Sequence, residues 1–263
     1  MRLALFINGR LGLQVLNFLL QNSNHKIVAI VLNSQEKRST EYVENVKNLL
    51  GDSHLPQIIL WENMSKDFKI FHKELESPSH AVSALFGHIL PEDLIKEFTG
   101  GVLNLHPSLL PIGRGAHPIS WSIMDEQPQG ITLHLIDQGL DTGNIVFQKE
   151  IFTNVSMSAG EIYEIAMTEL LESFSKYFPR WIKGELDAYA QSESIGIRHT
   201  SKEMKSLRTI NENEVSTFGG FVRRLQATTF SDGRLPIYID NLDNMWEINF
   251  HILPQQDPKK SGE

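Results

Sequence analysis

The sequence contains no cysteine among its 263 residues. Disulfide bonds, zinc sites built on thiolates and thiol nucleophiles are therefore excluded. A chain without disulfides is suited to a reducing compartment, so we expect a cytoplasmic protein. Any enzymatic mechanism in this chain must do without a thiol.

Basic residues and long apolar runs are also scarce. The chain carries 24 Lys and Arg against 32 Asp and Glu, a net charge of -8, which argues against a nucleic-acid surface because phosphates need a basic footprint. The apolar start could suggest a signal peptide, but Asn8, Gly9 and Arg10 interrupt it. No apolar stretch approaches the roughly 20 residues of a membrane span. We therefore expect neither nucleic acid nor a membrane as a partner.

Motifs for several common cofactors are missing as well. The sequence has neither G-x-G-x-x-G nor a P-loop, which argues against nicotinamide and ATP chemistry. The ten histidines are scattered without H-E-x-x-H or another recognised ligand spacing. We therefore expect no metal.

Short apolar runs alternate with segments of helical periodicity. Leu13, Leu16 and Leu20 follow the first run at helical spacing. Such alternation is typical of a parallel sheet covered by helices on both faces, so we expect a doubly wound, Rossmann-like α/β fold with right-handed crossovers. We expect the runs at 130–137 and 143–152 to pair with each other, which would make the sheet mixed. The expected strands are 3–7, 26–32, 57–61, 80–86, 100–106, 130–137 and 143–152.

Two helices are expected from their start signals, and after the second the chain changes character, near residue 186. Pro91 and two acidic residues predict the first helix, over 91–98. Ser158 and Glu161 form an S-x-x-E capping box before an amphipathic helix that reaches about Lys183. The following segment is polar and irregular, then predicts a short helix at 218–230 and two strands at its end. We expect a catalytic domain over 1–185, an extension of a helix and a β-hairpin over 186–254, and a frayed tail over 255–263.

Two polar clusters follow predicted strands, and open α/β sheets bind ligands beyond the carboxyl ends of their strands. The first, NLHPSLLP at 104–111, places Asn104, His106 and Ser108 together; the second, IDQGLDTGN at 136–144, holds Asp137 and Asp141. Taken alone, the first is commonly a capped or solvated strand end and the second a hairpin turn. Together they supply an imidazole that can move a proton, a carboxylate that can charge it, and an amide for an oxyanion.

These groups suit acyl transfer to an amine. Ser108 has no nucleophile-elbow motif such as G-x-S-x-G around it, and no cysteine exists. Direct transfer between two bound substrates is therefore favoured over an acyl-enzyme.

The combination of NLHPSLLP, GRGAHP at 113–118, and LHLIDQGLDTGNIV at 133–146 resembles the folate-dependent formyltransferases. The resemblance is specific over about 80–155 and weak elsewhere. It implies transfer of a formyl group from N10-formyltetrahydrofolate to an amine. It also implies a catalytic trio in which His106 handles the proton of the amine, Asn104 steadies the formyl oxygen, and Asp141 orients and charges the imidazole.

The resemblance further implies a site for the pterin ring along LFGHILPEDL at 85–94 and the loop 136–141. Plain core packing is the alternative for Phe86, Ile89 and Leu90, and His88 is expected to be exposed rather than catalytic. The residues implied to bind the folate are Phe86, Gly87, His88, Ile89, Leu90, Asp137 and Gly139.

The family divides by acceptor, and three acceptors stay open: methionyl-tRNA, glycinamide ribonucleotide and a nucleotide-linked amino-dideoxy sugar. The acidic chain and its short extension disfavour a large polyanion such as tRNA. The first turn, NGRLG, lacks the serine-rich phosphate loop of glycinamide ribonucleotide enzymes. The sugar branch, with a dTDP-linked substrate, is the most similar, because GRGAHPISWSI at 113–123 and the segment 218–240 resemble its loop and its added helix and hairpin.

This branch implies a homodimer, a role in O-antigen, lipopolysaccharide or other polysaccharide sugar biosynthesis, and a pocket for the nucleotide sugar. An arginine from the first turn or from 223–224 could meet a pyrophosphate, although a pair of arginines on a helix is commonly a solvated face. Phe221, Phe230 and Tyr238 could stack on a base or form a small core. The residues expected to bind the acceptor are Asn8, Gly9, Arg10, Arg114, Gly115, His117, Trp121, His199, Arg223, Arg224, Phe230 and Tyr238. A non-catalytic ligand-binding relative is the rival from another class of protein.

Overall fold

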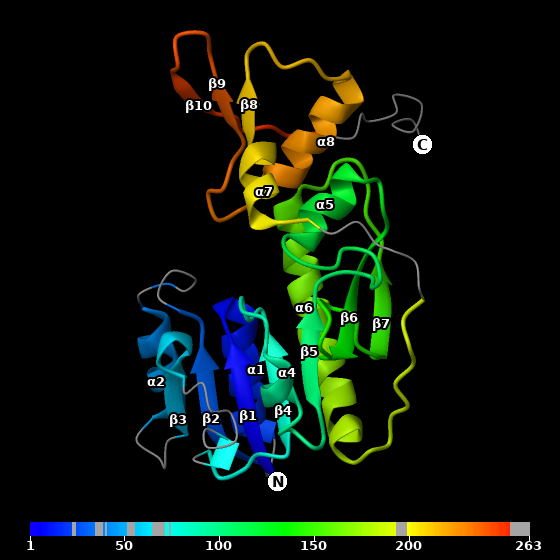
Figure 1. The fold of residues 1–263 in the computed structure, drawn as a ribbon. Coiled ribbons are helices and arrows are strands. Elements are labelled where there is room, and N and C mark those ends of the chain that lie inside the picture. Colours follow the sequence, from blue (N-terminus) through cyan, green and yellow to red (C-terminus); the bar gives the residue numbers. More distant parts are fainter. Residues whose placement is uncertain are drawn as a thin grey trace, which may run out of the picture.

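A mixed seven-stranded sheet forms the centre of the computed structural model. The structure describes residues 1–22, 25–34, 39, 41–51, 56–64, 72–73, 75–192 and 199–252. The strand order is β3-β2-β1-β4-β5-β6-β7, and β6 runs antiparallel to both β5 and β7. The doubly wound, mixed α/β fold expected from the sequence is confirmed (Figure 1). The strands are β1 (Arg2–Ile7), β2 (Lys26–Leu32), β3 (Gln57–Leu60), β4 (His80–Ala84), β5 (Val102–His106), β6 (Gln129–Leu135) and β7 (Ile145–Ile151).

Helices cover both faces of this sheet. Leu3, Leu5 and Ile7 of β1 belong to the apolar core that also includes α1, α2 and α6. Ala4 and Phe6 point to the opposite face, where they pack with residues of α4. This alternation follows from the two-residue period of a strand, and both faces are buried as parallel strands require. The helices are α1 (Gly9–Asn22), α2 (Tyr42–Leu50), α4 (Glu92–Ile95), α5 (Pro118–Met124) and α6 (Ala159–Ile182), and a 3-10 turn, η2 (Trp61–Asn63), follows β3.

The topology of the sheet places the ligand site. The chain builds β1, β2 and β3 in one direction and then returns to add β4 on the other side of β1. A crevice forms outside the carboxyl ends of the strands where the winding direction reverses. The segments after β4 and β5 therefore meet at one edge of the sheet. Because β6 is antiparallel to β5, the loop that follows β6 starts at the opposite edge and reaches the crevice through Asp137 to Asp141.

The long helix α6 begins where the sequence predicted. The Ser158 side chain accepts the backbone N–H of Glu161, and the Glu161 carboxylate accepts the backbone N–H of Ser158 at 2.7 Å. This reciprocal capping box satisfies two of the free donors at the start of the helix. The expected helix over 91–98 is shorter, because its regular part ends at Ile95.

The extension is richer than the expected helix and hairpin. It contains α7 (Ser201–Arg208), β8 (Thr209–Asn211), α8 (Phe218–Thr228), β9 (Ile237–Ile239) and β10 (Met245–Glu247), and its strands form a second sheet in the order β10-β9-β8. The sequence predicted α8 and the hairpin. It did not predict α5, α7 or β8, because these elements are short and α7 contains few apolar residues.

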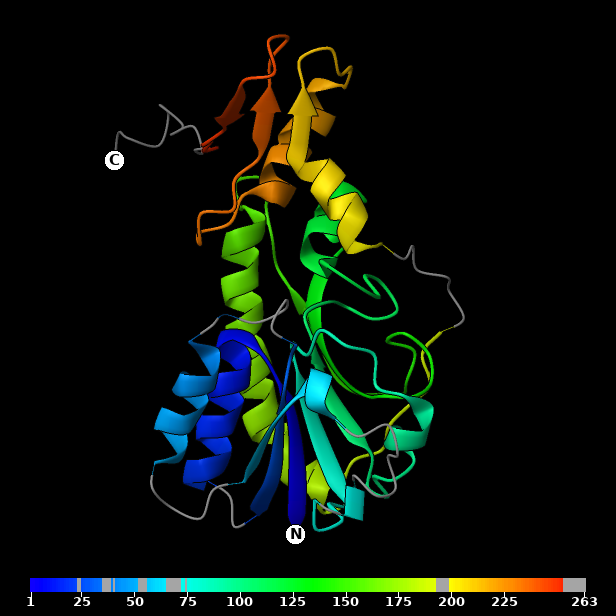
Figure 2. The same ribbon diagram turned by 60° about the vertical axis from the view of Figure 1, so that its left-hand side comes forward.

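The extension packs on the end of the main domain that lies away from the N-terminus (Figures 1 and 2). There α8 lies against α5, and the segment after α8 reaches the start of α6. Within the part of the chain that the structure describes, no helix is both long enough and apolar enough to cross a membrane. The tail expected over 255–263 lies outside the described residues.

Candidate active site

A pocket of about 540 Å³ lies at the carboxyl ends of β4 and β5. Its walls come from the segments after β4, β5 and β6, from the start of α5, from α6 and from the extension. Asn104, His106 and Asp141 all line it, so the structure brings together the three residues of the expected trio. The volume is in the range of pockets that hold small molecules.

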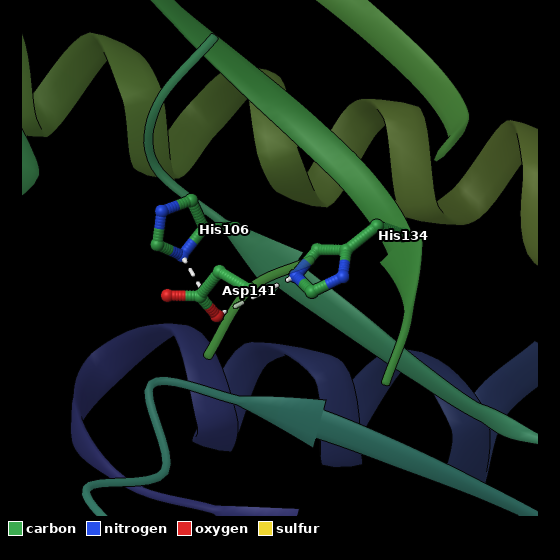
Figure 3. Close-up of side chains that lie close together, drawn as sticks. All are labelled: His106, His134 and Asp141. Atoms are coloured by element: carbon green, nitrogen blue, oxygen red, sulfur yellow. Dashed lines mark ion pairs between the residues drawn. The ribbon is translucent and has the colours of Figure 1, made fainter. Parts of the chain in front are cut away.

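The ring of His106 is held by a backbone carbonyl. Its Nε2 lies 3.0 Å from the carbonyl oxygen of Gly113, and because a carbonyl can only accept, Nε2 carries the hydrogen. The neutral ring therefore keeps its lone pair on Nδ1, which lies 3.8 Å from Asp141 Oδ1 (Figure 3). His106 is thus ready to accept a proton on the side that faces the carboxylate.

A second histidine, His134 on β6, completes the cluster (Figure 3). Its Nδ1 donates to the carbonyl oxygen of Leu135 at 3.0 Å, so its Nε2 accepts from Nδ2 of Asn104 at 3.0 Å. Burial, together with the neighbouring charge of His106, lowers the pKa of His134 to about 4. His134 is therefore neutral near pH 7 and fixes the amide of Asn104, whose second N–H is left for a ligand.

The carboxylate of Asp141 is also positioned by the backbone. Asp141 adopts a left-handed conformation with φ of 54°, which is uncommon outside glycine and is found at functional loops. The backbone N–H of Gly115 donates to Asp141 Oδ2 at 2.9 Å. Burial alone would raise the pKa of Asp141, but His106, His134, the Gly115 N–H and Arg114 together hold that pKa below its usual value. The group is therefore a carboxylate at neutral pH.

Gly143 sets the path of the loop that carries Asp141. A Cβ atom at this position would lie 1.7 Å from the carbonyl oxygen of Leu135, a distance that no side chain can tolerate. The loop closes tightly on the end of β6 because residue 143 has no side chain. The D-T-G sequence thus combines a functional carboxylate with the glycine that places it.

The arrangement suits proton transfer beside a developing oxyanion. His106 Nδ1 can take a proton, Asp141 can stabilise the resulting imidazolium, and Asn104 can donate to an oxygen. Ligand atoms of His106, His134 and Asp141 lie within 4.8 Å of one another, so this set could also hold a metal ion. Its contacts favour the acid–base interpretation, because Asn104 already occupies His134 Nε2 and Gly115 already occupies one carboxylate oxygen.

Comparison with known proteins identifies the family. Residues 1–170 match the family model described as formyl transferase. The chain belongs to this family. The resemblance to formyltransferases that the sequence motifs suggested is therefore confirmed, and the match covers more than half of the chain.

Two curated relatives of this family member differ in their acceptors. It is 35% identical over 118 residues to a methionyl-tRNA formyltransferase of Clostridium novyi, a match that covers 44% of this chain and 38% of the relative. It is 34% identical over 138 residues to a dTDP-4-amino-4,6-dideoxyglucose formyltransferase of Mycobacterium bovis, with 52% and 58% covered. The matches thus span less than two thirds of either relative.

Solved structures extend the likeness of fold to the extension. A sugar N-formyltransferase from a Shewanella species superimposes with a TM-score of 0.79 at 18% identity, covering 97% of this chain and 99% of that one. An N-formyltransferase from Helicobacter canadensis, solved with folinic acid and dTDP-3-aminofucose, gives a TM-score of 0.65 at 18% identity, with 90% and 85% covered. The chain therefore shares its overall fold, with the extension included, with these solved structures.

All the residues expected at the pterin site line the pocket of this formyl transferase family member. Leu90 is also part of the core, and Phe86 meets Trp61 edge to face with ring centroids 5.4 Å apart. The ring of His88 stacks on Trp61, with 4.8 Å between centroids, and is half-buried rather than exposed. The pocket-lining members of this set are Phe86, Gly87, His88, Ile89, Leu90, Asp137 and Gly139.

The residues expected at the acceptor site divide into those that line the pocket, those that support its wall, and those that lie outside it. Four of them line the pocket: Gly115, His117, His199 and Phe230. Trp121 supports His199 from behind, with the two rings stacked at 3.7 Å. Arg114 donates to Gln191, whose amide in turn donates to the carbonyl oxygens of Asp141 and Gly143 at 2.8 Å. Arg114 and Trp121 thus hold the pocket wall in place.

The remaining acceptor candidates do not belong to the described lining of the pocket, and these are Asn8, Gly9, Arg10, Arg223, Arg224 and Tyr238. Arg224 is committed to structure: it pairs with Glu214 and donates to the carbonyl oxygens of Ser206, Leu207 and Thr209. The other arginines of this group also have acidic partners, because Arg10 pairs with Glu164 and Arg223 with Glu126.

Several lining residues were not singled out by the sequence analysis, and the ionisable ones among them are His134, Tyr163 and Arg234. His134 is the residue before the last of the buried strand β6 and lies just ahead of the D-x-G-x-D loop, and this position could have marked it. Tyr163 and Arg234 have no comparable signal. They come from α6 and from the segment after α8, which meet only in the folded chain.

Proposed function

We propose that this chain is an N-formyltransferase that moves a formyl group from N10-formyltetrahydrofolate to the amine of a dTDP-linked amino-dideoxy sugar. The observation that carries this proposal is the meeting of Asn104, His106 and Asp141 in one pocket, with the base nitrogen of His106 facing the carboxylate. Membership of the formyl transferase family supports the chemistry.

The proposed reaction is a direct transfer. The neutral amine attacks the formyl carbon, a C–N bond forms, and the bond from that carbon to N10 of the folate breaks. Nδ1 of His106 takes the proton that the amine loses and returns one to N10. The free N–H of Asn104 donates to the oxyanion of the tetrahedral intermediate, and Asp141 stabilises the imidazolium.

Several observations favour a sugar nucleotide over the other two acceptors. The net charge of -8 disfavours a tRNA surface. The extension contributes His199, Phe230 and Arg234 to the pocket. These residues could bind an acceptor in addition to the folate. A curated relative acts on a dTDP-linked amino sugar, and the fold of solved sugar N-formyltransferases covers almost the whole chain.

A panel of acceptors tests this proposal. The purified protein is incubated with N10-formyltetrahydrofolate and with a dTDP-amino sugar, glycinamide ribonucleotide or methionyl-tRNA, and formylated products are measured by mass spectrometry. We expect formylation of the amino sugar alone. Transfer only to one of the other two would refute the choice of acceptor, and ligand binding without any transfer would support a non-catalytic relative.

The same proposal divides the chain into a catalytic domain over 1–185 and an acceptor-binding extension over 186–254. We also propose that the protein is cytoplasmic, because a chain without cysteine suits a reducing compartment. We further propose a homodimer, because large apolar side chains are exposed on the extension: Val215, Phe218, Leu242, Met245 and Trp246. Light scattering on the purified protein tests the dimer, and a monomer at micromolar concentration would refute it. The formylated sugar nucleotide would serve a glycosyltransferase in the synthesis of O-antigen, lipopolysaccharide or a related polysaccharide.

A further inference from the structure

One arginine of the extension reaches the pocket. Arg234 lies in the segment between α8 and β9 and lines the pocket together with Phe230 of the same segment. Its guanidinium carbon lies 4.2 Å from the centre of the Phe230 ring, a cation–π arrangement. The side chain is 45% exposed, so its charge is accessible to a ligand.

The segment that carries Arg234 contacts the main domain through its backbone. The backbone N–H of Gly160, in the first turn of α6, donates to the carbonyl oxygen of Thr229 at 2.9 Å. A Cβ atom on Gly160 would lie 2.8 Å from Cα of Phe230, so the close approach depends on this glycine. The backbone N–H of Phe230 donates to the carbonyl oxygen of Arg234 at 2.9 Å, which closes the segment into a turn.

Asp232 fixes the orientation of the guanidinium group. Its carboxylate accepts from Nε of Arg234 at 2.9 Å and lies 2.8 Å from Nη2. Nη1 makes no hydrogen bond to the residues that the structure describes. One edge of the planar group is therefore held by the protein, while the other can donate to an anion.

The groups around Arg234 are suited to an anionic ligand. Arg234 and His117 both line the pocket, and the charge of Arg234 adds to burial in lowering the pKa of His117. Burial raises the pKa of Tyr163, so its hydroxyl stays protonated and can donate a hydrogen bond. The charge of Arg10 also acts on the pKa of Tyr163. Arg10 is paired with Glu164, however, and is not among the described residues that line the pocket. Among the described residues that line the pocket, Arg234 is thus the only arginine.

We infer that Arg234 binds the diphosphate of the acceptor, with Phe230 as the surface that holds the guanidinium in place and Tyr163 as a second donor. The inference rests on the proposed function, since a diphosphate is present only if the acceptor is a sugar nucleotide. It assigns to Arg234 the role that the sequence suggested for Arg10, Arg223 or Arg224.

Calorimetric titration with dTDP and with thymidine tests this inference without any need for catalysis. Arg234→Gln should weaken dTDP binding about tenfold or more, because a charge-assisted hydrogen bond is lost, and should leave thymidine binding unchanged. Arg234→Lys should lie between wild type and Arg234→Gln, since it keeps the charge without the planar fork. Arg180→Gln, which removes an exposed arginine at the far end of α6, should bind dTDP as wild type does.

Steady-state kinetics with the dTDP-amino sugar give a second measurement. Arg234→Gln should raise KM about tenfold and leave kcat nearly unchanged, because the diphosphate is held equally in the ground and transition states. Wild-type affinity for dTDP in Arg234→Gln would overturn the inference and leave the proposed function standing. A wild-type protein that formylates another acceptor and binds no dTDP would instead refute the proposed function, and with it the role of Arg234.

Discussion

The ring nitrogens of two histidines define the chemistry of this site at the scale of single residues. Backbone carbonyls of Gly113 and Leu135 each take one ring N–H, which leaves one lone pair per ring directed into the cluster. His106 offers its lone pair beside Asp141, whereas His134 uses its own to hold Asn104. The two rings therefore have different tasks: one moves a proton and the other positions an amide.

Removal of the negative charge at residue 141 should slow the reaction. Asp141→Asn keeps the shape of the side chain but cannot stabilise a charged His106, so we expect kcat to fall about a hundredfold. Circular dichroism should show that the fold is retained. A kcat within twofold of wild type would remove Asp141 from the mechanism.

The cluster of His106, His134 and Asp141 also has the composition of a metal site, and a chelator separates the two interpretations. Since the contacts favour proton transfer, dialysis against EDTA should leave the rate of formyl transfer unchanged. Elemental analysis before dialysis provides the matched control. Loss of activity that returns on addition of Zn²⁺ would contradict the acid–base interpretation.

The loop between β6 and β7 shows how an element prepares the site. Asp141 stands in a left-handed conformation, and the loop approaches β6 closely at Gly143. The sequence predicted both strands and the importance of this glycine-rich loop. The position of His134 directly before this loop could have marked it as a candidate, but the face of the strand that it occupies depends on the register of β6, which is set by its partners.

A side chain at residue 143 should disturb the site more than the fold. Gly143→Ala forces the backbone away from Leu135, so we expect Asp141 to move and kcat to fall by at least tenfold. Gly219→Ala is a suitable control, since a Cβ there meets only an arginine tip at 3.8 Å. Its activity should equal that of wild type. Full activity in Gly143→Ala would show that the loop does not depend on this close approach.

The whole molecule combines a predictable main domain with an extension whose role the sequence left open. The positions of the strands and the start of α6 follow from apolar runs and capping, as Ser158 and Glu161 illustrate for α6. Contacts such as Gly160 with Phe230 join segments far apart in the chain. No local pattern encodes such a contact, which is why the sequence analysis missed Arg234 and named Arg224 instead, whose partners lie within the extension.

The stability of the molecule should depend on pH through buried histidines. His134 has a folded pKa of about 4, and burial also lowers the pKa of His80 and His117. The unfolded chain then binds more protons below about pH 6.5, so stability is highest above that pH and is lost as the pH falls toward 4.

Urea unfolding at pH 7 and at pH 5 measures this effect. His134 alone should account for a loss of ~2 kcal/mol in the free energy of unfolding between the two values. His134→Asn should show a smaller loss, whereas replacement of the exposed His251 by Asn should leave the difference as in wild type. An equal loss in wild type and His134→Asn would show that His134 is not the group responsible.

The central claim is that His106 moves the proton while a formyl group passes directly from the folate to the amine of a sugar nucleotide. Single-turnover transfer from N10-formyltetrahydrofolate to a dTDP-amino sugar, compared between wild type and His106→Asn, tests it most directly. We predict rapid transfer by wild type and a rate about 10²–10⁴-fold lower for the variant, with dTDP affinity unchanged. Equal rates for the two proteins, or no transfer by wild type, would contradict the account.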